Sequence, residues 1–184
     1  MKSKTQKIST ITITRVALST AVICVLGPLS FSIPVSPVPI SLGILGIFFA
    51  VYVNGILWGS VSTLLYILLG FVGVPVFAGF TAGAGKLLGP TGGYIVGYIF
   101  LSLIAGFFID KFEKKIYLHV IGMILGTACL YAFGTVWLAI LAHMTFKAAL
   151  WAGVIPFIPA DLIKIAVAIA VGIPVRRGIK KITG

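Results

Sequence analysis

Charged residues are scarce in this chain. Only 9% of its 184 residues are Asp, Glu, Lys or Arg, whereas an ordinary soluble domain has about 25%. So low a share excludes a soluble globular domain. Apolar residues make up 60% of the sequence, which excludes an intrinsically disordered protein, because disorder requires low hydrophobicity. We therefore expect a protein that lies and acts within a membrane.

Residues able to build a catalytic or metal centre are equally few. The chain has three acidic residues, two histidines and two cysteines, and they are scattered along the sequence. Metal-assisted hydrolysis needs clustered His or carboxylate ligands, so we expect no metal site and no catalytic residue. A phosphate-binding loop of the Gly-x-x-x-x-Gly-Lys-Ser/Thr type is also missing. We expect a protein that is not an enzyme, needs no cofactor and does not hydrolyse ATP by itself.

Long apolar runs, divided by Pro, Gly and polar residues, occupy most of the sequence. A membrane-spanning helix needs about 20 apolar residues, so six spans use roughly 120 residues and leave about 60 for loops and tails. The fold class we predict is an all-α integral membrane protein with one membrane domain over 1–184. The six predicted spans are 11–31, 39–53, 55–72, 91–110, 115–138 and 158–178. Only the residues 52–55 separate the second span from the third, which predicts a tight helical hairpin.

Positive charges are unevenly distributed along the chain. The net charge is +11, which in a soluble protein would suggest a nucleic-acid partner. Here 11 of the 14 Lys and Arg residues lie in the two terminal tails and around the 53–55 turn and the 110–115 loop. Such a distribution sets membrane topology. We therefore expect both termini in the cytoplasm of a bacterial-type cell, no nucleic-acid binding, and outward loops at about 28–38, 73–90 and 139–157.

The three outward loops are long, apolar and rich in Pro and Gly. Irregular backbone at membrane depth is tolerated only where protein covers it or where it lines a polar cavity. Such loops suit a lid over a small-molecule pocket, and the alternative is that they are plain connectors. In the third loop, His143 and Lys147 are one helical turn apart, which predicts an interfacial helix.

Asp161 and Lys164, at the mouth of the sixth span, are the ionisable residues that we take as the leading candidates for a functional site. Intramembrane charges are energetically expensive and often functional. At positions i and i+3 near the start of the sixth helix, these two residues share a face and can neutralise each other. Two structural interpretations remain open: an ion pair that only stabilises the fold, and an N-cap formed by Asp161.

The segment Gly89-Pro90-Thr91-Gly92-Gly93-Tyr94 opens the fourth span. Thr91 can cap the helix, the glycines permit close backbone approach, and Tyr94 offers a rigid ring with a polar tip. The alternative is helix initiation with close packing, because Gly93 and Gly97 form a pair of small residues of the kind common in membrane helices.

Four motifs occur in order along the chain. They are Pro37-Val38-Pro39-Ile40, Gly73-Val74-Pro75-Val76-Phe77-Ala78-Gly79, Gly89-Pro90-Thr91-Gly92-Gly93-Tyr94 and Pro156-Phe157-Ile158-Pro159-Ala160-Asp161-Leu162-Ile163-Lys164. In combination they resemble the BioY family, the biotin-binding S components of energy-coupling factor (ECF) transporters. The resemblance covers about residues 10–180. Two positions depart from the family pattern: Gly43 stands where Gln is common, and Gly79-Phe80 replaces a common Gly-Gly.

The resemblance implies a six-helix subunit that captures biotin outside and delivers it inward after docking on a membrane T component bearing two ATPases. Biotin is then the transported ligand and not a cofactor. S components carry an Ala-x-x-x-Ala strip on the first helix for the T component, and Ala17 and Ala21 match that pattern. From the residues alone, ordinary packing explains this pair equally well. The alternative function is a self-sufficient secondary carrier for another small solute, with Asp161 as the acid available for ion coupling.

The resemblance also implies a site for the three parts of biotin, namely a ureido ring, an apolar bicycle and a carboxylate. Asp161 can accept the ureido N–H bonds, and Tyr94 or Thr91 can donate to the ureido carbonyl. Lys164 can neutralise Asp161 or the carboxylate, aromatic rings can pack the bicycle, and outer lysines can attract the anion. The substrate-binding residues we predict are Asp161, Lys164, Tyr94, Thr91, Gly79, Phe77, Lys86, Phe31 and Trp151, with Tyr66, Tyr98 and Lys147 as further candidates.

Overall fold

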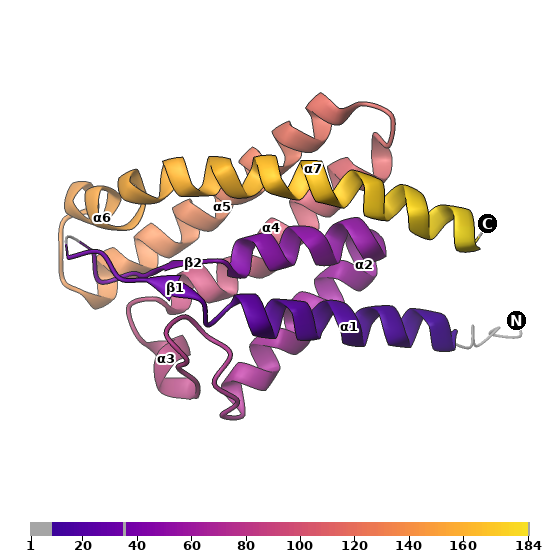
Figure 1. Cartoon of the computed structure of the whole chain (residues 1–184). Coiled ribbons are helices and arrows are strands. Elements are labelled where there is room, and N and C mark those ends of the chain that lie inside the picture. Colours follow the sequence, from indigo (N-terminus) through magenta and orange to yellow (C-terminus); the bar gives the residue numbers. More distant parts are fainter. Residues whose placement is uncertain (1–8, 35, 184) are drawn as a thin grey trace, which may run out of the picture.

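Helices make up most of the molecule (Figure 1). The structure is a computed structural model and describes residues 9–34 and 36–183. Its helices are α1 (Thr10–Leu26), α2 (Gly43–Phe71), α3 (Ala84–Leu88), α4 (Gly92–Lys111), α5 (Ile116–Leu141), α6 (Phe146–Gly153) and α7 (Ile158–Thr183), with a 3-10 turn, η1 (Ile155–Phe157), before α7. Two short strands, β1 (Ser30–Phe31) and β2 (Ile40–Ser41), pair antiparallel.

Several of these helices are long and apolar enough to cross a bilayer. In the described part of the chain they are α2, α4, α5 and the helical stretch Phe146–Lys181 that contains α6 and α7. The 17-residue α1 is a shorter apolar helix. Because α2 consists of two halves, the described residues form a bundle of six membrane helices: α1, the halves of α2, α4, α5 and α7. The predicted fold class, an all-α integral membrane protein, is confirmed.

The two halves of α2 meet at Gly55, where the backbone takes φ +73° and ψ −172°. Glycine suits this position because a side chain is strained at positive φ, and a Cβ would lie 2.7 Å from Asp110 Oδ2. The same carboxylate oxygen accepts the N–H of Ile56 at 2.7 Å, which satisfies a donor at the start of the second half. The second half then packs against the first, with Gly59 close to Val51. The chain thus turns where the sequence predicts a hairpin.

One end of the bundle carries a network of charged side chains, which we call the charged end. Arg176 donates to Asp110 at 2.7 Å, to Glu113 at 3.2 Å and to the carbonyl of Tyr52 at 3.3 Å. Lys180 also pairs with Glu113. The hydrogen bond from Lys180 lowers the pKa of Glu113, against the opposing effect of burial and with further help from Arg176, so this carboxylate is ionised at neutral pH. These bonds join α7, the turn of α2, the end of α4 and the loop that follows it.

Both terminal helices have their outer ends at the charged end (Figure 1). The strands β1 and β2, together with α3 and α6, lie at the opposite end. The arrangement groups the 53–55 turn, the 110–115 loop and the two terminal helix ends, as the charge distribution predicts. The predicted topology charges Lys2, Lys4 and Lys7 lie outside the described residues. The cytoplasmic position of this end stays a prediction.

Some predictions about loops and helix ends are wrong in detail. α1 ends at Leu26 rather than near residue 31, because Gly27 and Pro28 follow and the chain then enters β1. The outward loops are also less irregular than expected, since they contain β1, β2, α3 and α6. His143 lies before α6 with φ +51°, so it does not share a helical face with Lys147, which is exposed on α6.

Cysteine labelling can determine which end faces outward. In a background without Cys24 and Cys129, we expect an impermeant thiol reagent to label Gly85→Cys in intact cells, because α3 lies opposite the positively charged end and Gly85 is exposed with open space around its Cβ. Lys114→Cys, in the exposed turn before α5, should react only after the cells are permeabilised. If only Lys114→Cys is labelled in intact cells, the charged end faces outward and the predicted topology is inverted.

Candidate functional site

Two small cavities adjoin between the chain that leads into α2 and the first turns of α4. Their volumes are about 30 and 40 Å³. Both are lined by Val38, Pro39, Ser41, Tyr94 and Tyr98. From this shared wall, one cavity extends toward α3 and the other toward α5 and α7. We call the two together the inner cavity.

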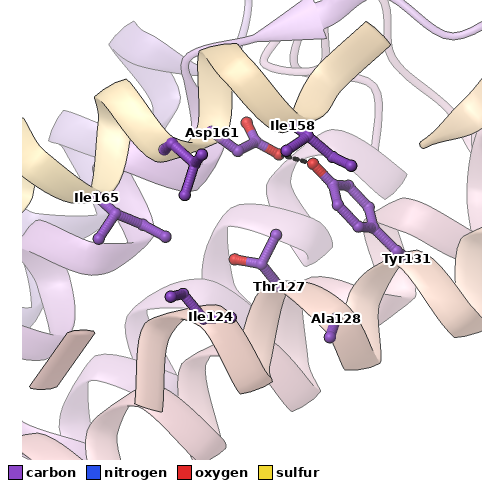
Figure 2. A pocket seen from close by; sticks show the side chains of 8 residues that line it. Ile124, Thr127, Ala128, Tyr131, Ile158, Asp161 and Ile165 are labelled. Atoms are coloured by element: carbon purple, nitrogen blue, oxygen red, sulfur yellow. Dashed lines mark hydrogen bonds between the residues drawn. The ribbon is translucent and has the colours of Figure 1, made fainter. Parts of the chain in front are cut away.

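A buried ion pair forms the polar wall of the inner cavity. Lys164 Nζ donates to Asp161 Oδ1 at 2.7 Å, and the side chains are 6% and 4% exposed. The hydroxyl of Tyr131 donates to Asp161 Oδ2. Figure 2 shows Tyr131 and Asp161 pointing toward each other from α5 and α7. Asp161 lies in the first turn of α7 and not at its N-cap position, so the interpretation as an N-cap is wrong.

This polar wall retains hydrogen-bonding capacity. Each carboxylate oxygen of Asp161 has two lone pairs and accepts one hydrogen bond from a side chain, so each can accept another. Lys164 carries three N–H groups, and Asp161 is its hydrogen-bond partner within the described residues. The pair can therefore accept two N–H groups and donate to an oxygen of a ligand at the same time.

Aromatic rings form much of the remaining wall. Phe77 is fully buried and meets Tyr66 edge to face, with ring centroids 5.7 Å apart. Tyr66 and Tyr98 follow at 6.4 Å. Phe77 reaches this position because Gly70 lacks a side chain, since a Cβ there would lie 2.1 Å from the Phe77 ring. The predicted candidates Phe77, Tyr66 and Tyr98 thus all line the cavity.

Tyr94 lines both parts of the inner cavity and also ties α4 to α6. Its hydroxyl donates to the carbonyl of Gly153 at 3.0 Å, and its ring packs on Gly134 of α5. Because that proton is already engaged, Tyr94 can meet a ligand with its ring face and its oxygen lone pairs. A donor role toward a ligand carbonyl would require the bond to Gly153 to break.

Thr91 and Lys86 line the part of the inner cavity that extends toward α3. Thr91 occupies the N-cap position of α4, but its side chain makes no capping hydrogen bond. The predicted cap by the Thr91 side chain is therefore not formed. Lys86 is half-buried on α3 and brings a positive charge to the side of the cavity opposite the Asp161 pair.

Three predicted site residues lie away from the inner cavity. Phe31 is 74% exposed on β1 and Trp151 is 63% exposed on α6, so neither ring packs into the cavity. Gly79 does not line it either, although its neighbour Ala78 does. Instead Gly79, with φ +73°, donates its N–H to the carbonyl of Pro28 at 3.0 Å and thereby fixes the loop that carries Phe77.

Sequence reasoning missed Tyr131 and Ser41. Tyr131 is 30 residues from Asp161 on another helix, and one Tyr in an apolar run gives no signal of such a contact. Ser41 donates to the carbonyl of Gly27 at 2.7 Å and accepts from the N–H of Gly43. A Cβ at Gly43 would lie 3.4 Å from the hydroxyl of Tyr98. Position 43, where the resemblance led us to expect Gln, therefore lies at the edge of the inner cavity.

An apolar groove lies on the other side of the Tyr131 and Asp161 pair, between α5 and α7 (Figure 2). Its volume is about 210 Å³, and it is otherwise lined by Ile124, Thr127, Ala128, Ile158, Leu162 and Ile165. Because Tyr131 and Asp161 line both the groove and the inner cavity, their hydrogen bond separates the two spaces.

A bundle of membrane helices that encloses a cavity with one buried ion pair and an aromatic wall is a membrane-embedded binding protein for a small solute. Comparison with known proteins identifies the family. The BioY family model matches residues 1–181, and the chain belongs to the BioY family.

Individual relatives agree with this assignment. The biotin transporter BioY of Thermotoga maritima is 36% identical over 146 residues, which cover 79% of this chain and 85% of that protein. Biotin transporter BioY2 of Lactococcus lactis is 32% identical over 167 residues, or 91% of each chain. A crystal structure at 2.1 Å of the S-component for biotin from an ECF-type ABC transporter matches with a TM-score of 0.86 and 29% identity, over 93% of this chain and 95% of that one. The chain is accordingly a multi-pass protein of the cell membrane, in a family of transporter components rather than catalysts.

Proposed function

We propose that this chain is the high-affinity biotin-binding subunit of an ECF transporter and that it captures biotin from outside the cell. The observation that carries the proposal is the inner cavity, in which the Asp161 and Lys164 pair faces a wall of aromatic rings. Relatives named biotin transporters, and the structural match to an S-component for biotin, support it.

The chemistry of the cavity matches the parts of biotin. Asp161 has free lone pairs for a ureido N–H group, and Lys164 can donate to the neighbouring ureido carbonyl or pair only with Asp161. The rings of Phe77, Tyr66 and Tyr98 offer apolar faces to the bicycle. Lys86, on the opposite side of the cavity, is then placed to neutralise the carboxylate. The ligand leaves chemically unchanged, so the chain acts without catalysis and without a cofactor.

The energy for uptake comes from other proteins in this proposal. The sequence has no phosphate-binding loop, so ATP hydrolysis is assigned to two ATPases bound to a membrane T component. Ala17 and Ala21 are exposed on the face of α1 that points away from the bundle, while Val16, Ser19, Thr20 and Ile23 point inward. This exposed strip of small side chains is the surface that we assign to the T component.

Equilibrium binding by the purified full chain tests the proposal. We expect mass spectrometry to find biotin carried through mild purification, and we expect a titration to show saturable biotin binding. Diaminobiotin, in which the ureido carbonyl is missing, should bind at least tenfold more weakly, because it leaves the polar wall without its matching group. In liposomes that contain only this chain, an imposed proton gradient should drive no uptake. Equal affinity for both compounds, or gradient-driven uptake, would contradict the proposal.

A further inference from the structure

A further cavity lies at the charged end, apart from the inner cavity and the apolar groove. Its volume is about 290 Å³, and it is bounded by α1, the Gly55 turn of α2, the end of α4 and α7. Its charged lining residues are Arg15, Asp110, Arg176 and Lys180. We call this cavity the basic recess, because three of these four side chains are positive.

The acidic residue of the basic recess is already neutralised. Asp110 Oδ1 accepts from Arg176 Nη2 at 2.7 Å, and Asp110 Oδ2 accepts from the backbone N–H of Ile56 at 2.7 Å. Lys180 is paired with Glu113 on the outer side. The remaining positive charge that faces the recess is that of Arg15.

Two guanidinium groups in the recess have donors without acceptors. Arg176 Nε is buried and has no hydrogen-bond partner among the described residues. Arg15 is half-buried, and no hydrogen bond or ion pair of its side chain occurs within 9–34 and 36–183. A buried N–H without an acceptor is unfavourable, and guanidinium is a donor that cannot lose its charge. The recess is therefore short of negatively charged oxygen atoms.

We propose that the basic recess binds a phosphate group, supplied by the headgroup of an anionic phospholipid. Guanidinium groups match phosphate oxygens with paired N–H donors. The recess also lies near the membrane boundary, since it sits at the charged end, where the ion pairs of Arg176 with Asp110 and Glu113 close the apolar spans. Basic pockets between membrane helices on the cytoplasmic side bind such headgroups. A phosphate tethered to the bilayer is held at this depth, whereas a soluble phosphate must diffuse to it.

Native mass spectrometry of the full chain in a neutral detergent tests this assignment. The probes are short-chain phosphatidylglycerol, phosphatidylcholine as the zwitterionic reference, and inorganic phosphate. We expect Arg15→Gln to weaken phosphatidylglycerol binding about tenfold, because a charge-assisted contact is lost. Arg15→Lys, which keeps the charge but not the paired donors, should lose part of this affinity.

Arg177→Gln is the matched control, because Arg177 is exposed beside Arg176 at the same end and does not line the recess. Both Gln variants should still bind biotin like the unmodified chain, which verifies that they are folded. If inorganic phosphate binds as tightly as phosphatidylglycerol and depends on Arg15 in the same way, the recess is a phosphate site. Its ligand is then soluble phosphate, and the lipid assignment is wrong. Equal phosphatidylglycerol binding by Arg15→Gln and Arg177→Gln would overturn the proposal.

Discussion

Asp161→Asn should weaken biotin binding about ten- to hundredfold. The carboxylate of Asp161 lines the inner cavity with unused lone pairs, and an amide would present an N–H where the ureido ring needs an acceptor. Loss of a charge-assisted hydrogen bond costs on the order of 1.5–3 kcal/mol. The dissociation constant of the purified protein for biotin measures the effect.

Two further variants keep this result interpretable. Asp161→Asn leaves Lys164 buried without its partner, which can destabilise the fold. The double variant Asp161→Asn with Lys164→Gln removes both charges, and it should also bind weakly. Glu113→Gln removes an exposed acid at the charged end and should bind biotin normally. Unchanged affinity in a folded Asp161→Asn protein would reduce the pair to a structural role.

Trp at position 17 or 21 should abolish ATP-dependent biotin uptake while biotin binding survives. Ala17 and Ala21 are exposed on α1, and membrane helices associate largely through close packing of small residues. A large ring on this strip holds a facing helix several ångströms away. Binding should persist because neither Ala17 nor Ala21 lines the inner cavity. Uptake into cells that also produce the T component and its two ATPases, and biotin binding by the purified chain, are the two measurements.

Ala132→Trp provides the same substitution at an exposed position of α5. It should leave uptake intact, which separates docking on α1 from a general effect of an added ring. Normal uptake with Trp at both positions of α1 would mean that another surface contacts the energising proteins. Loss of biotin binding in the same variants would instead mean that this strip is needed for the folded structure of the chain itself.

The sequence predicted the helical class because a bilayer leaves the backbone few choices. Without water, each backbone N–H and C=O must be satisfied internally, so long apolar runs become helices wherever they cross. The hairpin was predictable for the related reason that Gly55 interrupts one apolar run, and Gly55 does adopt a left-handed backbone conformation. The pairing of Asp161 with Lys164 was also predictable, since residues three apart on a helix are neighbours.

Loop residues show where sequence reasoning failed. Phe31 and Phe77 are both aromatic residues of outward loops, yet Phe31 is exposed and Phe77 is fully buried. The difference arises from the space left at Gly70 and from backbone hydrogen bonds that hold the loop, including that from Gly79 to Pro28. Neither feature has a periodic signal, because irregular segments do not alternate their faces regularly.

The sequence alone thus determined the composition-dependent properties: a membrane location, six helices, a local ion pair and the end of the bundle that carries the positive charges. Only the tertiary structure decided which distant side chains meet. It brought Tyr131 to Asp161 from 30 positions away, and it joined Arg176 to Asp110 across 66 positions, although the sequence had assigned Arg176 to topology. The local features follow from helical spacing and from the cost of unpaired backbone groups in lipid. The distant contacts depend on how the helices pack, and this packing follows from the shapes of side chains over the whole bundle.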